Sequence, residues 1–154
     1  MARVLGSALL QQQRLGQYSV VRQYTVRNRH LKHDAVLRVL WTYEPGKGRR
    51  FKVISNQGAS GVTRRSIMTL LETEAANSQT KSDPSQIGPD HYTFKFAEPA
   101  KDDYRIQLTP RATSKFLLNG FATVTSRDWA IVRVEGKTSQ RLSFWVSEAY
   151  IVQD

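Results

Sequence analysis

The chain has 154 residues, a formal net charge of +10 and no cysteine. That length fits one domain with a single core, which needs neither a disulfide nor a metal ion to fold. The lack of cysteine excludes disulfides, thiolate catalysis and cysteine-ligated zinc. No apolar run approaches the roughly 20 residues that a membrane-spanning helix needs. We therefore predict a single domain over 1–154 with no transmembrane segment.

The first elements in the chain are a helix and three strands. Apolar residues at near-helical spacing predict a short amphipathic helix over 2–15, where we find no convincing signal-peptide pattern. From Tyr18 the apolar period changes to two, which predicts strands at 18–27, 35–44 and 50–55. Pro45-Gly46-Lys47-Gly48 is a turn sequence of the kind that joins antiparallel neighbours, so this part is predicted to be a meander.

A second helix and five further strands follow. Ser60 is the predicted N-cap of a helix whose apolar stripe runs over 62–76. Residues 77–90 are rich in Ser, Asn, Gln, Asp, Pro and Gly, which predicts a surface loop. Apolar segments bounded by turn residues then predict strands at 92–96, 104–109, 116–125, 129–135 and 142–152. The predicted class is α+β: a curved antiparallel sheet or open, incomplete β-barrel with an N-terminal helix and one inserted helix.

The candidate catalytic and metal-binding groups all have simpler interpretations. His30 and His33 lie in a predicted turn with several cations, whose field opposes a metal ion. Ser78-Gln79-Thr80-Lys81 matches the S-x-x-K string of penicillin-recognising enzymes, but it lies in the polar loop and no K-T-G strand follows. Gly58-Ala59-Ser60-Gly61 precedes a helix, yet it lacks GK[ST] and a second βαβ unit. We therefore predict a protein that is not an enzyme and has no metal site and no cofactor.

The positive charge gathers at two predicted turns and at the start of the second helix. The residues expected to contact an anionic surface are Arg27, Arg29, Lys32, Lys47, Arg49 and Arg50. Aromatic residues mostly share a register with aliphatic ones, as Trp41 does with Val39, whereas RNA-binding sheets expose their aromatics among cations. We interpret the charge as a surface attracted to anionic lipid head groups. A basic nucleic-acid-binding β domain is the alternative.

Four segments of the second half of the chain carry a family resemblance. They read DYRIQLTPR at 103–111, KFLLNG at 115–120, DWAIVRVEG at 128–136 and SFWV at 143–146. In order and spacing they resemble the outer-membrane lipoprotein-sorting (LolA-like) family, and the 18–22 strand and Arg64-Arg65 are also similar to it. The resemblance implies an open antiparallel barrel with helices packed into its mouth, whose apolar concave face shelters acyl chains in the periplasm. The chain departs from the family at Thr123-Val124-Thr125, where relatives often have Trp-Val-Asp.

The resemblance implies a non-enzymatic carrier or binding protein for acyl chains of lipids or lipoproteins in the bacterial cell envelope. On this view the concave face binds the chain, the 62–76 helix acts as a lid, and burial contributes about 0.8 kcal/mol per CH₂. Relatives carry a signal peptide and continue with further strands beyond the position of Asp154, so we expect this chain to lack both. The predicted cavity residues are Leu37, Val39, Trp41, Tyr43, Ile67, Leu70, Leu71, Tyr104, Ile106 and Leu108.

Overall fold

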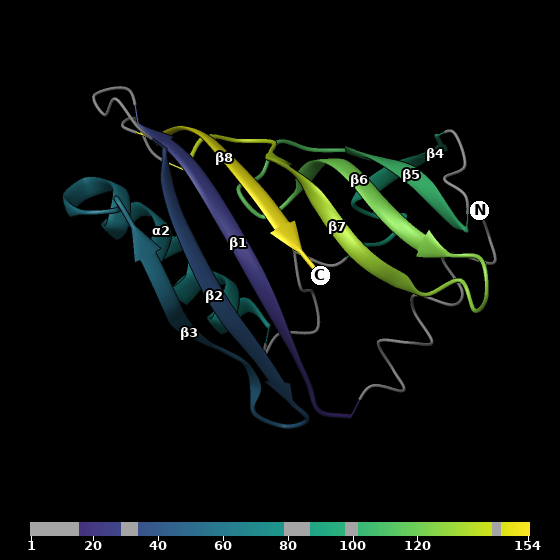
Figure 1. The fold of residues 1–154 in the computed structure, drawn as a ribbon, viewed down its shortest axis with the longest axis horizontal. Coiled ribbons are helices and arrows are strands. Elements are labelled where there is room, and N and C mark those ends of the chain that lie inside the picture. The colour runs from purple at the N-terminus through teal and green to yellow at the C-terminus, as the bar shows by residue number, and fades with distance from the viewer. Residues whose placement is uncertain (1–15, 29–33, 79–86, 98–101, 143–145) are drawn as a thin grey trace.

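In the part of the chain that the structure describes, the fold is a single antiparallel sheet with one helix on one of its faces (Figure 1). The computed structural model describes residues 16–28, 34–78, 87–97, 102–142 and 146–154. The strands are β1 (Tyr18–Asn28), β2 (Ala35–Glu44), β3 (Gly48–Gln57), β4 (Tyr92–Phe96), β5 (Asp103–Pro110), β6 (Leu118–Thr125), β7 (Ile131–Thr138) and β8 (Val146–Gln153). The helix is α2 (Gly61–Asn77).

The described strands lie in the order β3-β2-β1-β8-β7-β6-β5-β4, so the sheet has two edges and is not closed. The predicted α+β class is confirmed, as are the inserted helix and the division into three strands before it and five after it. The predicted helix at 2–15 lies outside the described residues, as do 79–86 of the predicted loop at 77–90. Asn77 belongs to α2 instead of the loop, because the helix continues one residue further than predicted.

Two meanders make the sheet, and the first and last strands join them. β1 to β3 form one meander and β4 to β8 the other, and each pairs only neighbours in the chain. The two meet where β1 pairs antiparallel with β8, which places Tyr24 opposite Ile151 and Arg22 opposite Gln153. The end of the described chain therefore lies in the middle of the sheet, beside residues from its beginning.

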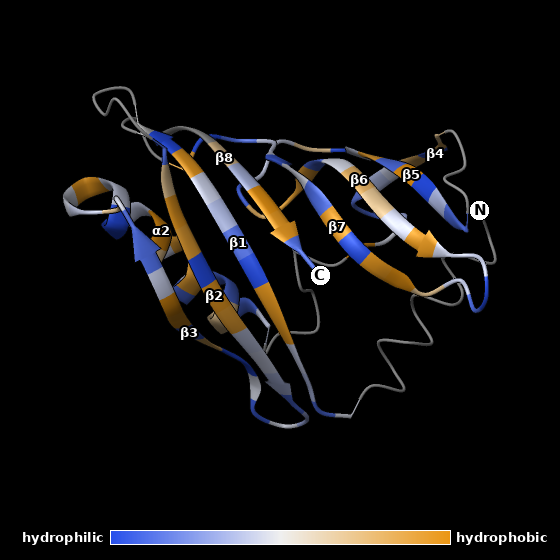
Figure 2. Cartoon of the chain, viewed as in Figure 1, coloured by the Kyte–Doolittle hydropathy of each residue, from blue (hydrophilic) through white to orange (hydrophobic). Residues whose placement is uncertain are grey.

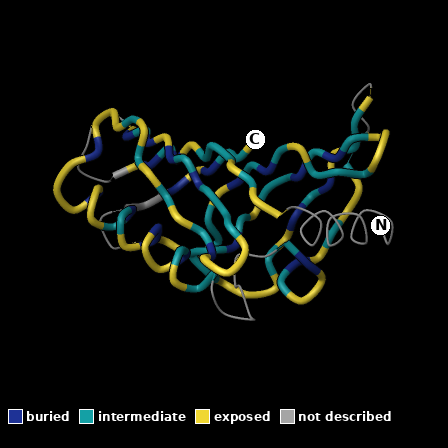
Figure 3. The backbone as a smooth tube through the Cα atoms, turned by 90° about the horizontal axis from the view of Figure 1, so that it is seen from below, coloured by how far each residue is buried: buried dark blue, intermediate teal, exposed yellow. Residues whose placement is uncertain are grey.

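The helix α2 packs against the first meander. Buried residues alternate with more exposed ones along β2, and hydrophobic and hydrophilic residues are interspersed along the strands (Figures 2 and 3). The buried face of β2 packs in one core with α2. The main core contains Leu37 and Val39 of β2 and Ile67 and Leu71 of α2, each at most 1% exposed. Ser60 occupies the N-cap as predicted, but its side chain makes no capping hydrogen bond.

The second meander has its own core on the same sheet. Its buried residues are Tyr92, Ile106, Leu108, Leu117, Ala122, Val124 and Val134. Leu118, at the start of β6, packs against both cores and is half-buried. The region between the two cores therefore lies beside Leu118, and the candidate site lies there.

Candidate ligand-binding site

A cavity of about 130 Å³ lies between the two cores, on the face of the sheet that carries α2. Its walls come from β1, β2, β3, α2, Ile87, the start of β4 at Tyr92, the segment 115–118 and residues of β7 and β8. Aromatic and aliphatic side chains form part of the wall, including Trp41 and Phe116. The rest of the wall is polar or charged, which distinguishes this space from the two apolar cores beside it.

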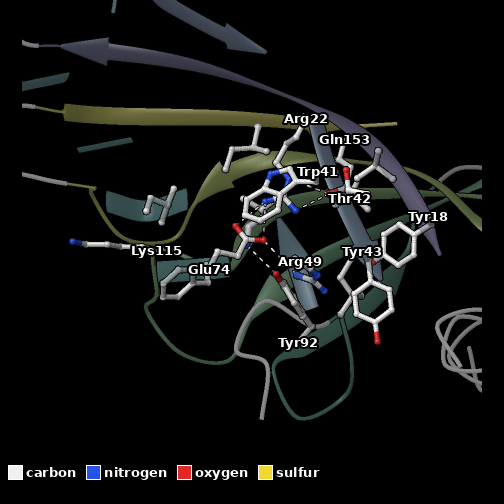
Figure 4. Close-up of a pocket in the computed structure, with 17 residues that line it drawn as sticks. Tyr18, Arg22, Trp41, Thr42, Tyr43, Arg49, Glu74, Tyr92, Lys115 and Gln153 are labelled. Atoms are coloured by element: carbon white, nitrogen blue, oxygen red, sulfur yellow. Dashed lines mark hydrogen bonds and ion pairs between the residues drawn. The ribbon is translucent and has the colours of Figure 1, made fainter. Parts of the chain in front are cut away.

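Three charged side chains from three elements meet in the cavity (Figure 4). Arg22 of β1 donates from Nη1 to both carboxylate oxygens of Glu74 on α2, at 2.9 and 2.8 Å. Arg49 of β3 places its Nη1 at 3.5 Å from Oε1 of the same carboxylate. The side chains of Arg22, Glu74 and Arg49 are only 15%, 4% and 18% exposed. We call these three residues the charged cluster.

Further hydrogen bonds fix the position of Arg22. Its Nε and Nη2 atoms donate to Oε1 of Gln153 at 3.0 and 2.7 Å, and Nη1 also donates to the Tyr24 hydroxyl at 3.1 Å. Its guanidinium carbon lies 5.3 Å from the centroid of the Trp41 ring, within the range of a cation–π contact. Burial lowers the pKa of Arg22, but attraction by Tyr24 and Glu74 more than offsets it, and the pKa lies above its ordinary value.

Strand geometry explains why an arginine points inward here. Side chains two residues apart lie on the same face of a strand, so Arg22 shares its face with Val20 and Tyr24, which both pack in the main core. Glu74 follows Leu70 and Leu71 by four and three residues, which places it on the buried stripe of α2. Sequence analysis predicted Arg49 as an anionic-surface contact and missed Arg22 and Glu74, although a charged residue on an apolar face was the available signal at both positions.

One buried donor in the wall of the cavity has no acceptor. The Nε1 atom of Trp41 is buried and has no hydrogen-bond partner among the described residues, and the Trp41 residue is 2% exposed. The Tyr24 hydroxyl interacts with the indole without a hydrogen bond of suitable distance and angle. Buried indole N–H groups usually find a partner, and the Tyr24 hydroxyl is the polar group beside this one.

A groove of about 420 Å³ lies on the other side of Leu70 and Phe116. It runs along α2, where Val62, Ser66 and Thr69 line it, and Leu142 also lines it. The cavity and the groove share the lining residues Leu70, Lys115 and Phe116, so the two spaces are adjacent. The Lys115 side chain points away from the charged cluster (Figure 4).

The structure separates the predicted cavity residues into two groups. Trp41, Tyr43 and Leu70 line the cavity. Leu37, Val39, Ile67 and Leu71 lie next to them but are packed inside the main core. Tyr104, Ile106 and Leu108 belong to the second core, where the Tyr104 ring stacks on that of Trp129 with centroids 5.0 Å apart.

The predicted basic contact residues also differ in their placement. Arg27 pairs with Asp34 at 3.4 Å, and Lys47 and Arg50 both pair with Glu44, at 2.9 and 2.7 Å. The hydrogen bond from Lys47 lowers the pKa of Glu44, because it favours the ionised carboxylate. Arg49 faces the cavity, whereas Arg29 and Lys32 lie outside the described residues.

Within the described ranges, α2 is too short and too polar to cross a membrane. In the same part of the chain, histidine, aspartate and glutamate side chains nowhere gather in the groups of three that a metal ion requires. Comparison of the chain with protein-family models and with curated proteins finds no match.

Proposed function

We propose that this protein is a non-enzymatic carrier or binding protein for the acyl chains of lipids or lipoproteins. The observation that carries the proposal is the pair of adjacent spaces that meet at Leu70 and Phe116, beneath the apolar face of an open sheet. The resemblance to the LolA-like family supports the same function and gives the bacterial cell envelope as the proposed compartment.

The dimensions of the two spaces support binding of a small apolar ligand. The groove, at about 420 Å³, falls within the roughly 300–1,000 Å³ that ligand pockets usually have. Its lining by Val62, Leu70, Phe116 and Leu142 is suited to a hydrocarbon chain. Each buried CH₂ adds about 0.8 kcal/mol to binding, so burial of the hydrocarbon chain in the groove can supply the affinity by itself.

Binding of a fluorescent fatty acid to the full chain tests this function. Thr69 is exposed on α2 and lines the groove, so Thr69→Trp fills the space that the chain would occupy. Ala76 is exposed on the same helix and lines neither space, so Ala76→Trp is the matched control. We expect Thr69→Trp to weaken binding at least about tenfold, which corresponds to the burial of about two CH₂ groups.

Ala76→Trp should bind the fatty acid as the unmodified protein does. Absence of binding to the unmodified protein, or equal binding to both tryptophan variants, would remove the carrier proposal. Nucleic-acid binding is the competing function, and it would show as strongly salt-dependent binding. We expect none, because Trp41 packs in the main core beside Val39, whereas sheets that bind RNA expose their aromatic residues among cations.

A further inference from the structure

The groove along α2 is lined by two cations and, among the described residues, by no carboxylate. The cations are Arg65 of α2 and Lys115, whose side chain points away from the charged cluster (Figure 4). In the part of the chain that the structure describes, neither side chain forms an ion pair or a hydrogen bond. Lys47 and Arg50, by contrast, both pair with Glu44. The groove therefore holds two positive charges that no carboxylate of these ranges contacts.

Helix geometry places Arg65 on the side of α2 that forms the groove. Arg65 follows Val62 by three residues and precedes Thr69 by four, so the three side chains are neighbours on one side of the helix. Arg64 is also exposed but lines neither space, because one residue turns the helix by about 100°. The cation in the groove is therefore particular to Arg65 and is not shared by its basic neighbour.

The apolar part of the same wall is partly open to solvent. Val62 is 48% exposed, and it lines the groove together with Phe116 and Leu142. A hydrocarbon chain that covers this surface removes it from water, which favours binding. Arginine and lysine side chains can lay their aliphatic stems along apolar surface while their charged ends stay in water. Arg65 and Lys115 can therefore border a bound chain and still reach a charged group at its end.

We propose that the groove binds a single-chain amphiphile with an anionic head group, a carboxylate or a phosphate, that pairs with Arg65 and Lys115. The chain of the ligand lies against Val62, Phe116 and Leu142. Both cations line one space of about 420 Å³, so a compact head group there is within reach of two long side chains. This inference rests on the proposed acyl-chain binding and adds the charge of the head group.

Ligands that share one chain and differ in the head group test the inference on the full protein. The dissociation constants of laurate, dodecyl phosphate and dodecanol are measured by displacement of a fluorescent fatty acid, below each critical micelle concentration and at low ionic strength. We expect one or both anions to bind at least about fivefold more tightly than dodecanol, which is the size expected of two exposed ion pairs. In about 1 M salt the preference should fall below about twofold, because exposed charges are then screened.

Two double variants with the same change in net charge separate the groove from the overall charge of the protein. Arg65→Gln with Lys115→Gln removes both cations of the groove. Arg64→Gln with Lys95→Gln removes two exposed cations that line neither space. The first variant should prefer anions by less than about twofold and keep its affinity for dodecanol, and the second should keep the full preference. An equal preference in the two variants would overturn the inference.

The unmodified protein distinguishes failure of this inference from failure of the proposed function. Equal affinity for dodecanol and both anions would overturn the inference and leave acyl-chain binding standing, whereas failure of all three ligands to bind would overturn both. Acetate and inorganic phosphate, at the concentration at which laurate competes, should not displace the fluorescent fatty acid, because they bury no chain. Displacement by either would show a simple anion site and overturn the assignment of an amphiphile.

Discussion

Arg22 and Glu74 are 52 residues apart in the sequence, yet Nη1 of the arginine lies 2.8 Å from Oε2 of the glutamate. The pair joins the central strand β1 to the helix α2. Because the same guanidinium also binds Gln153, on β8, one side chain links three elements that are distant in the chain. The arrangement of the cavity walls therefore depends on this contact.

Removing one partner of this pair should destabilise the fold. Glu74→Gln removes the carboxylate that the guanidinium of Arg22 binds, and breaking a buried pair in this way typically costs about 3 kcal/mol. The free energy of unfolding from urea titration measures the loss, with the dependence on urea unchanged. Glu72→Gln, on the exposed face of the same helix, should change stability by less than about 0.5 kcal/mol.

A double-variant cycle separates the pair from its surroundings. Arg22→Met combined with Glu74→Leu replaces charge with apolar volume, which is often tolerated in a core. We expect the double variant to lose less stability than the two single variants added together, by about 1 kcal/mol or more. Strict additivity would show that the two side chains do not stabilise one another.

Leucine-to-alanine substitutions on the two faces of β2 should lower the free energy of unfolding by different amounts. Leu37 is 1% exposed and packs in the main core with α2, so Leu37→Ala should cost about 3 kcal/mol through the lost contacts and the space left behind. Leu40 is half-buried on the opposite face, and Leu40→Ala should cost about 1 kcal/mol or less. Equal losses in urea unfolding would contradict the assignment of faces.

Local patterns in the sequence predict the strands well but not the contacts among them. Alternation identifies all eight strands and the buried face of β2, because one half-buried face imposes a period of two. Pairing of β1 with β8 leaves no such local mark. The predicted lining of one cavity included both Trp41 and Tyr104, but β2 and β5 are five strand spacings apart in the sheet order, about 24 Å along the sheet.

Arg22 and Glu74 were missed for a related reason. A charged residue at one position of an apolar face resembles an ordinary break in the pattern until its partner is known. Arg22 and Glu74 each lie on such a face, and only the packing of α2 on β1 brings them together. The cavity is therefore a property of tertiary contacts that neither segment shows alone.

Gly120 on β6 and Gly136 on β7 face one another across the strand pair, and their place in the sheet cannot hold a larger residue. A Cβ atom at Gly120 would lie 2.5 Å from the Cα of Gly136 and closer still to the backbone oxygen of Glu135. Gly120→Ala should therefore cost about 3 kcal/mol, since the backbones must separate. Gly16→Ala meets nothing within 4 Å and should leave the urea midpoint unchanged.

Ionisation of a buried tyrosine should destabilise the protein at high pH. Burial raises the pKa of Tyr92 above its ordinary value, so the folded state holds this proton more tightly than the unfolded chain does. The stabilisation is complete below the pKa of the unfolded chain, about 10, and is lost as the pH rises from there through the folded pKa. Urea unfolding at a series of alkaline pH values measures the decline.

Tyr92→Phe gives the control for that decline. The Tyr92 hydroxyl accepts a hydrogen bond from the Leu118 backbone N–H at 2.9 Å, so the variant should lose about 1–2 kcal/mol near neutral pH. Because phenylalanine has no proton to release, the free energy of unfolding of the variant should fall less steeply above about pH 10. Parallel curves for the two proteins would mean that ionisation of Tyr92 does not contribute to alkaline unfolding.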